Sequence, residues 1–523
     1  MTTVLSGLTE LPAVELAEKI SRGEVSAVEA VEAHIEQIER VNPKINAVVY
    51  KRYNQARKEA RHADAQRARG EKLGVLHGVP VTIKECLDLA ESPSTFGLPS
   101  RAKMLAKQDD PYVARLRAEG AIVLGKTNVA QLLIFVETEN PLYGRTNNPW
   151  NLERSAGGSS GGQAAIIAAG GSPLGLGTDL GGSIRFPSTS CGIVGFKPTT
   201  GRCPDQGRFS LPIGQQAIFS QVGVMGRRVA DVTTGLTVIN GGSNPAVEPA
   251  RPLGDPSQVD LSGLRVAFYS DDGTLKPAPA VRRAVVEAAQ ILQGLGAQIF
   301  EWQPPRVDRA VDLFYGIMTA DGGAGLRQRL GKNKADPRVA QLLSLGKFPR
   351  PVFKMLLGLL KAGGQESMVK VIRNFGYKDT DHYWQLLEEQ LDYRESFEVA
   401  MNEAEGGPID LILCPASPLP AVTHGSTKDL GTLGGYTVLW NVLGYPTGIL
   451  PFTRVRQEEE VGRVLSKDKV EQAALQVEKG SAGLPVGVQI VARPWREHTA
   501  LAAMQAIEKV ASHRPDYPGI ARV

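Results

Sequence analysis

The sequence lacks the features that mark several specialised classes of protein. It has no uninterrupted run of about 18 apolar residues, so no segment is predicted to cross a bilayer as a helix. Its 59 Lys and Arg are well mixed with its 55 Asp and Glu, and no long basic block points to nucleic acid as a partner. It also has no internal repeat and no low-complexity tract. A globular fold with a large core is therefore favoured.

Cysteine and histidine are scarce, and this scarcity limits the chemistry. The four cysteines are widely spaced, without the clustering of a metal site or a disulfide framework. Only seven histidines occur, and none lies in a glycine-rich segment where it would pair with a serine. The stretch Met1 to Pro12 has neither the basic nor the apolar region of a secretory signal. We therefore expect a cytoplasmic protein that uses no metal and no cofactor.

Helical and strand-like segments alternate along the chain, and this pattern predicts an α/β fold. Residues 10–41 show helical apolar spacing, and Ser26 with Glu29 forms a capping box in the second of two expected helices. The β-branched run around 79–83 predicts a buried strand that ends at Lys84.

Four further segments complete the expected organisation. Residues 127–133 are predicted to begin a helix, and 151–154 are not predicted to form a strand. A shift to proline and acidic residues predicts a surface connection over 244–256. The strongly charged segment 456–480 is expected on the surface.

The most informative stretch runs from Gly157 to Arg202. It begins Gly-Gly-Ser-Ser-Gly-Gly and continues with Thr-Asp-Leu-Gly-Gly-Ser-Ile-Arg, so that Ser159 and Ser183 both lie beside paired glycines. Glycine allows sharp turns, and successive backbone N–H groups in such turns can hold an anion. A serine in that setting is suited to attack a carbonyl carbon while main-chain donors stabilise the oxyanion.

A serine nucleophile needs a base, and Lys84 is the candidate. Burial disfavours the charged form of lysine, and Ser-Lys pairs are a known variant of triad chemistry. A lysine at the end of a strand is more often a solvated surface residue. The interpretation of Lys84 therefore depends on the two serines that accompany it.

Together these segments resemble the amidase signature family, whose members hydrolyse amides with a Ser-Ser-Lys triad. The matching segments are 157–162, 173–185, Cys191-Gly192, Lys197-Pro198-Thr199 and, upstream, 78–84. The resemblance implies an α/β fold with a large mixed twisted sheet flanked on both faces by helices. It further implies a single domain over 1–523, with the signature core at about 74–240 and lid helices at about 340–375.

The resemblance also implies a role for each matching residue. Ser183 would be the nucleophile, Ser159 the bridging serine on a cis peptide bond, and Lys84 the base. The oxyanion hole would consist of the backbone N–H groups of Leu180, Gly181, Gly182 and Ser183. The supporting residues would be Thr178, Asp179, Arg185 and Ser160, and the substrate contacts would include Leu133 and Ile134.

Within the family the chain is most similar to the fatty acid amide hydrolases. The apolar and basic stretch 348–361 falls where those enzymes carry a membrane cap, and its pattern is equally typical of an interfacial helix and of a buried one. The resemblance implies a lipid or other hydrophobic N-acyl amide as substrate and peripheral membrane contact through 348–361. A homodimer is a candidate assembly.

Several alternatives stay open beside this interpretation. Gly157–Gly161 fits the Gly-x-Ser-x-Gly elbow of α/β-hydrolases, but no histidine motif follows it. Gly120–Thr127 fits the Gly-x4-Gly-Lys-Thr motif of nucleotide-binding proteins, although its Ala-Ile-Val-Leu run is typical of a strand. Within the enzyme class, the alternatives are a soluble amidase for aryl or short aliphatic amides and a glutamine-hydrolysing amidotransferase subunit.

Overall fold

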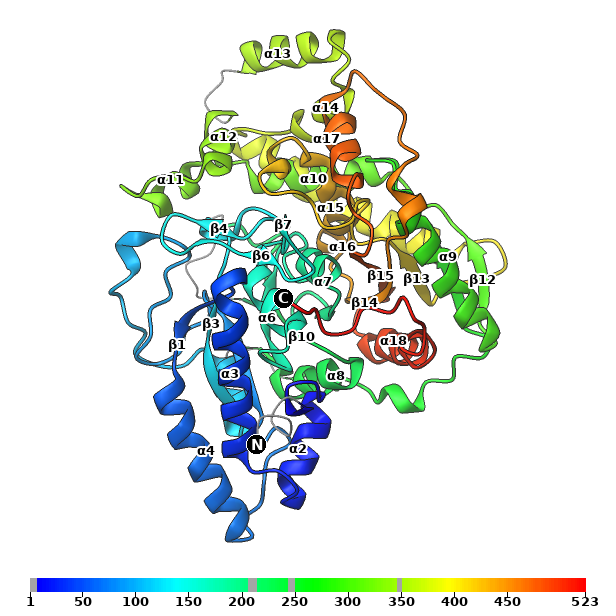
Figure 1. The fold of residues 1–523 in the computed structure, drawn as a ribbon. Helices are drawn as coiled ribbons and strands as arrows, with labels where there is room; N and C mark the ends of the chain where they lie inside the picture. The colour runs from blue at the N-terminus through cyan, green and yellow to red at the C-terminus, as the bar shows by residue number, and fades with distance from the viewer. Residues whose placement is uncertain (1–6, 206–213, 243–249, 346–349) are drawn as a thin grey trace.

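The computed structural model describes residues 7–205, 214–242, 250–345 and 350–523, and these residues are built around an eleven-stranded sheet (Figure 1). The strand order is β1-β3-β2-β8-β10-β9-β14-β15-β13-β11-β12. The bounds are β1 Val48–Lys51, β2 Pro80–Lys84, β3 Ile122–Thr127, β8 Leu174–Asp179, β9 Val194–Lys197, β10 Gln221–Gly226, β11 Arg265–Phe268, β12 Gln298–Glu301, β13 Leu411–Cys414, β14 Thr447–Arg454 and β15 Pro485–Ala492. Because β2 is parallel to β3 and β8 while β10 is antiparallel to β8 and β9, the sheet is mixed, as the resemblance implied.

The strands are apolar on both faces because their alternate side chains enter different cores. In β3, Val123 packs into one core, whereas Ile122 and Leu124 pack into the core on the other face. β13 repeats this alternation, with Ile412 facing away from its two leucine neighbours. A strand buried in this way reads as a continuous apolar run, which explains why several strands are visible in the sequence.

Helices cover both faces of the sheet (Figure 1). One face packs against α5 (Pro111–Ala118), α8 (Val229–Ile239), α9 (Pro279–Gly294) and α18 (Glu497–Ala511). The other face packs against α3 (Ala27–Ile45), α6 (Gly161–Ala168), α10 (Val307–Met318), α15 (Thr380–Asn402) and α16 (Gly435–Leu443). The remaining helices are α2 Ala13–Arg22, α4 Tyr53–Ala68, α7 Arg185–Cys191, α11 Ala324–Leu330, α12 Pro337–Leu345, α13 Arg350–Ala362, α14 Glu366–Ile372 and α17 Lys469–Glu478.

Two local predictions are confirmed. α3 begins with the expected capping box, in which Ser26 Oγ accepts a hydrogen bond from the Glu29 N–H and the Glu29 carboxylate accepts one from the Ser26 N–H. Lys84 is the last residue of β2, and all five residues of that strand are buried. Sequence periodicity therefore located the element that carries the candidate base.

Two other predictions are wrong. No helix begins at 127–133, because Thr127 ends β3 and Gln131–Leu133 form only a short 3-10 turn, η2. The backbone is redirected there by a long-range contact, since the Leu132 N–H donates to the Phe96 carbonyl oxygen at 2.9 Å.

The second error concerns residues 151–154. They do form a strand, β7 (Asn151–Ser155), which pairs with β6 (Asn147–Asn148) in a separate two-stranded sheet. A second pair of short strands, β4 (Glu139–Asn140) and β5 (Gly144–Arg145), precedes them.

The charged and connecting segments are more varied than expected. In 456–480, Arg463 and Glu478 form an ion pair at 2.8 Å with side chains only 3% and 2% exposed, so this segment is partly folded inward. Within the connection predicted over 244–256, residues 244–249 lie outside the described residues, and 250–252 are exposed.

The helices α11 to α14 gather at one end of the molecule, at the top of Figure 1. In the described part of the chain, no helix combines the length and apolar character needed to span a membrane. Residues 348 and 349 of the apolar-basic stretch lie outside the described residues, and the rest of the stretch belongs to α13.

Candidate active site

Lys84 is fully buried at the end of β2, where its amine meets two hydroxyl groups. Nζ lies 2.8 Å from Ser159 Oγ and 2.8 Å from Thr178 Oγ1, and it also donates to the Thr178 carbonyl oxygen at 3.4 Å. Thr178 comes from β8, the parallel neighbour of β2, and Ser159 comes from the loop before α6. The register of two parallel strands therefore positions the amine, as is typical of sites at strand ends.

Ser159 and Ser183 are brought together by the glycine-rich segments. The Gly158–Ser159 peptide bond is cis, as the resemblance implied. The backbone N–H of Ser160 donates to the Ser183 carbonyl oxygen at 3.2 Å, and Ser160 Oγ donates to the Thr178 carbonyl oxygen at 3.4 Å. Ser159 and Ser183 both line one cavity. The expected triad positions thus converge on one place in the fold.

Asp179 organises the loop that carries Ser183. Its carboxylate accepts hydrogen bonds from the Gly182 N–H at 2.8 Å and the Ile184 N–H at 3.1 Å, and it pairs with the Arg185 guanidinium at 2.9 Å. Burial by itself would raise the pKa of Asp179. The charge and hydrogen bonds of Arg185, together with Lys197 and Asn441, outweigh burial and hold that pKa well below its usual range. Asp179 is therefore an ionised anchor for the turn.

Arg185 extends this anchor to the other half of the sheet. Its guanidinium donates to Asn441 Oδ1 at 2.5 Å, to the Thr437 carbonyl oxygen at 2.9 Å and to Gln489 Oε1 at 3.3 Å. From the sequence alone, these three residues had no expected role. The structure shows that these residues of α16 and β15 fix the arginine that holds the loop carrying Ser183.

The structure corrects one member of the expected oxyanion hole. The Gly182 N–H is already paired with Asp179, so it supports the turn and is not directed to the cavity as a donor. Within the described residues, the N–H groups of Leu180, Gly181 and Ser183 have no such acceptor and keep the expected role as candidates. A glycine is still required at 182, because φ is +118° and a Cβ would lie 2.6 Å from Thr437 Oγ1.

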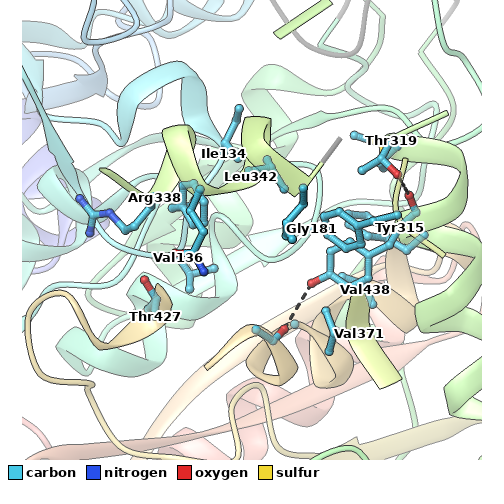
Figure 2. A pocket seen from close by; sticks show the side chains of 18 of the residues that line it. Ile134, Val136, Gly181, Tyr315, Thr319, Arg338, Leu342, Val371, Thr427 and Val438 are labelled. Carbon is cyan, nitrogen blue, oxygen red and sulfur yellow. Dashed lines mark hydrogen bonds between the residues drawn. The ribbon is translucent and has the colours of Figure 1, made fainter. Parts of the chain in front are cut away.

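The cavity beside the two serines has a volume of about 370 Å³ and a mainly apolar lining. Leu133 and Ile134, the expected substrate contacts, both line it. Figure 2 shows Ile134, Leu342 and Val371 around the space beside Gly181. Sequence reasoning missed the contributions of α10, α12 and α14, which are Phe314, Tyr315, Met318, Leu342, Leu343, Leu345, Met368, Val371 and Ile372.

Neither of the two alternative motifs forms the site that its pattern predicts. Gly120–Thr127 supplies β3 and not a phosphate-binding loop, and Lys126 Nζ is buried against the Pro93 carbonyl oxygen at 2.6 Å and Ser94 Oγ at 2.9 Å. In the Gly-x-Ser-x-Gly motif, Ser159 contacts a lysine and not a histidine. Over the described ranges, no three His, Cys, Asp or Glu side chains are grouped so that they could hold a metal ion.

Comparison with known proteins agrees with this geometry. The family model described as Amidase matches residues 29–501. Fatty-acid amide hydrolase 1 of Sus scrofa is 33% identical over 515 residues, covering 96% of this chain and 86% of the relative. Indoleacetamide hydrolase of Bradyrhizobium diazoefficiens is 32% identical over 511 residues, covering 96% and 87%. Fatty-acid amide hydrolase 2 of Homo sapiens is 30% identical over 532 residues, covering 97% and 90%.

A solved structure also resembles this chain over most of its length. A structure of fatty acid amide hydrolase superposes with a TM-score of 0.83 at 26% identity, covering 97% of this chain and 86% of that chain. The large mixed sheet and its flanking helices are therefore shared along almost the whole length of both chains.

Proposed function

Because the chain belongs to the amidase family and is a hydrolase of amide C–N bonds, we propose that it acts through Ser183, Ser159 and Lys84. The observation that carries this proposal is the 2.8 Å contact between Lys84 Nζ and Ser159 Oγ, next to a cavity that Ser159 and Ser183 line together. That distance allows a proton to move between the two groups.

The proposed reaction starts with an uncharged Lys84 amine. Lys84 accepts the Ser159 hydroxyl proton while Ser159 accepts the proton of Ser183, and Ser183 Oγ attacks the carbonyl carbon of the amide. The N–H groups of Leu180, Gly181 and Ser183 hold the oxyanion, and losing one such donor typically costs about 2.7–4 kcal/mol. The proton then returns through Ser159 to the leaving nitrogen, the C–N bond breaks, and water hydrolyses the acyl-enzyme.

The lining of the cavity supports a hydrophobic acyl group in the substrate. Leu132 and Val136 join the residues already named around a space of about 370 Å³, which is in the range of small-molecule sites. We therefore favour a lipid or other hydrophobic N-acyl amide over a short aliphatic amide or glutamine.

The helix α13 supports peripheral contact with a membrane. Its inward stripe, which includes Phe353, packs on Val371 and Ile372 of α14. Its outward stripe consists of Val352, Met355 and Leu359, which are 41%, 62% and 65% exposed and recur at helical spacing. An apolar stripe of this kind on a helix too short to span a bilayer is typical of interfacial binding.

The assignment of the nucleophile can be tested with a fluorophosphonate probe. Intact-protein mass spectrometry should show one adduct on the wild type and none on Ser183→Ala, because only an activated serine reacts with the probe. Ser220→Ala is the matched control, since Ser220 lines the same cavity outside the proposed triad, and it should be labelled normally. Labelling of Ser183→Ala at the wild-type rate would overturn the assignment.

The substrate class needs a separate panel of long-chain N-acyl amides, aryl amides, short aliphatic amides and glutamine. We expect kcat/KM to rise with acyl chain length, because each buried methylene contributes about 0.8 kcal/mol. A preference for glutamine or for short amides would favour the amidotransferase or the soluble amidase alternative.

A further inference from the structure

A second exposed apolar segment lies within the charged segment 456–480. In the residues 461–465, which we call the apolar loop, Val461, Val464 and Leu465 are 68%, 78% and 83% exposed. Large apolar side chains grouped at such exposure mark a contact surface. Between these exposed side chains, Arg463 turns inward and forms a buried ion pair with Glu478 at 2.8 Å, which anchors the loop.

Hydrogen bonds tie the residues that directly follow the apolar loop to the connection between α13 and α14. Gln365, between α13 and α14, donates to the Lys467 carbonyl oxygen at 2.9 Å and accepts from the Lys469 N–H at 3.0 Å. Asp468 accepts from the Ser367 N–H at 2.9 Å, in the first turn of α14. In Figure 1 the segment that leads into α17 rises beside α14, at the end of the molecule where α13 lies. The apolar loop and α13 therefore occupy the same end.

The charge of this region is mainly positive. The acidic run that directly precedes the apolar loop leaves Glu458 exposed and Glu460 partly exposed, next to the exposed Arg456. The exposed lysines of 351–370 and 461–469 are Lys354, Lys361, Lys370, Lys467 and Lys469. Over the same two ranges, Glu366 is the one exposed carboxylate, because Asp468 is buried where it caps α17. Lysines around an apolar surface are attracted to anionic lipid by roughly 1 kcal/mol each.

The same region contributes to the wall of the catalytic cavity. Val470, which follows the apolar loop at the start of α17, lines the cavity together with Met368 and Val371 of α14. A surface that contacts lipid at 461–465 would thus lie a few residues from the space in which an acyl chain would bind.

We propose that the apolar loop and α13 form a two-part docking surface for an anionic lipid bilayer, with Val464 and Leu465 inserting beside Met355 and Leu359. This inference rests on the proposed membrane contact of α13 and adds a second, independent insertion point. Two insertion points on separate segments fix the orientation of the molecule on the bilayer, which one helix alone does not.

The test is flotation of the full chain with vesicles of phosphatidylcholine, with and without phosphatidylglycerol. The wild type should bind the phosphatidylglycerol vesicles, and the double variant Val464→Asp/Leu465→Asp should bind about tenfold more weakly or worse. Val75→Asp is the matched control, because Val75 is 56% exposed and lies in the connection between α4 and β2, outside the proposed surface. This variant should bind normally. Unchanged turnover of a short soluble amide verifies that each variant is folded.

A parallel variant separates this inference from the proposed function. Met355→Asp/Leu359→Asp removes the α13 stripe alone. If this variant is released while the loop variant binds like the wild type, the apolar loop is not an insertion point and α13 still is. If the wild type binds no vesicle, both membrane proposals are wrong, and the amidase chemistry is judged separately by fluorophosphonate labelling.

A fluorescent probe reports directly whether the apolar loop inserts into the bilayer. The four native cysteines are buried, so a Cys introduced by Leu465→Cys can be labelled with an environment-sensitive dye. Its emission should shift to the blue on phosphatidylglycerol vesicles, and the emission of dye on Val75→Cys should not. Equal emission with and without vesicles at position 465 would overturn the proposal.

Discussion

The loop that carries Ser183 and the helices that cap the cavity are held in contrasting ways. Asp179 and Arg185 fix the loop with buried, charge-assisted hydrogen bonds that reach both halves of the sheet. α13 and α14 meet mainly through apolar side chains, and α13 leaves a second apolar stripe in contact with solvent. The difference matches the two proposed tasks, because bond-making needs atoms fixed in place whereas the proposed contact with a lipid surface needs an apolar area that is free to bind.

A pair of glycine substitutions tests most directly whether the loop that carries Ser183 is more tightly constrained than α13. Gly182→Ala should lower kcat/KM by about 100-fold or more and destabilise the protein by about 1–3 kcal/mol, because φ is +118° and the Cβ would meet Thr437 Oγ1 at 2.6 Å. Gly358→Ala, in α13, meets no atom within 4 Å and should stabilise the helix by up to about 1 kcal/mol with no loss of activity. Turnover assays and urea unfolding measure both effects. Wild-type activity in Gly182→Ala would show that the loop is not tightly constrained.

The buried Lys197 allows a test of this difference through the pH dependence of protein stability. Burial and then the charge of Arg185 lower the pKa of Lys197 to about 7, so the unfolded chain binds this proton between about pH 7 and 10.4 while the folded chain does not. Stability contributed at this site should therefore rise with pH over that range. The free energy of unfolding of the wild type, relative to that of Lys197→Met, should increase by on the order of 5 kcal/mol across it.

Urea unfolding at several pH values measures that difference. Lys354→Met is the matched control, because Lys354 is exposed on α13, and its difference from the wild type should stay flat with pH. A flat difference for Lys197→Met as well would mean that Lys197 titrates normally in the folded protein.

The smallest expected effect belongs to the outward stripe of the cap. Met355→Asp and Leu359→Asp should each change the free energy of unfolding by less than about 0.5 kcal/mol, because both side chains are more than half exposed. Turnover of a short soluble amide should not change either. A large loss of stability would place the stripe in a packed interface and not in solvent.

The sequence was most informative where one residue type is required by local geometry. The strand ending at Lys84, the capping box at Ser26 and the glycine-flanked serines could all be recognised from a few neighbouring residues. Prediction failed where distant segments decide the backbone, as in the turn at Leu132, whose N–H is taken up by Phe96. The same limit explains Gly182, because no pattern in the sequence reveals that Asp179 already occupies its N–H.

The residues that line the cavity could not be predicted from the sequence either. Phe314, Leu342 and Val371 sit on ordinary apolar helix faces, and a single sequence does not distinguish a face that packs into a core from one that lines a substrate cavity. The outward stripe of α13 was ambiguous for the same reason, and only the exposure of its side chains distinguishes it from a buried helix.

The most direct test of the central claim is the pH dependence of fluorophosphonate labelling in the wild type and in Lys84→Met. If the buried amine is the base, the wild-type rate should rise with pH as the amine loses its proton, and the variant should react much more slowly without that rise. A Lys84→Met variant that reproduces both the wild-type rate and its pH dependence would contradict the account.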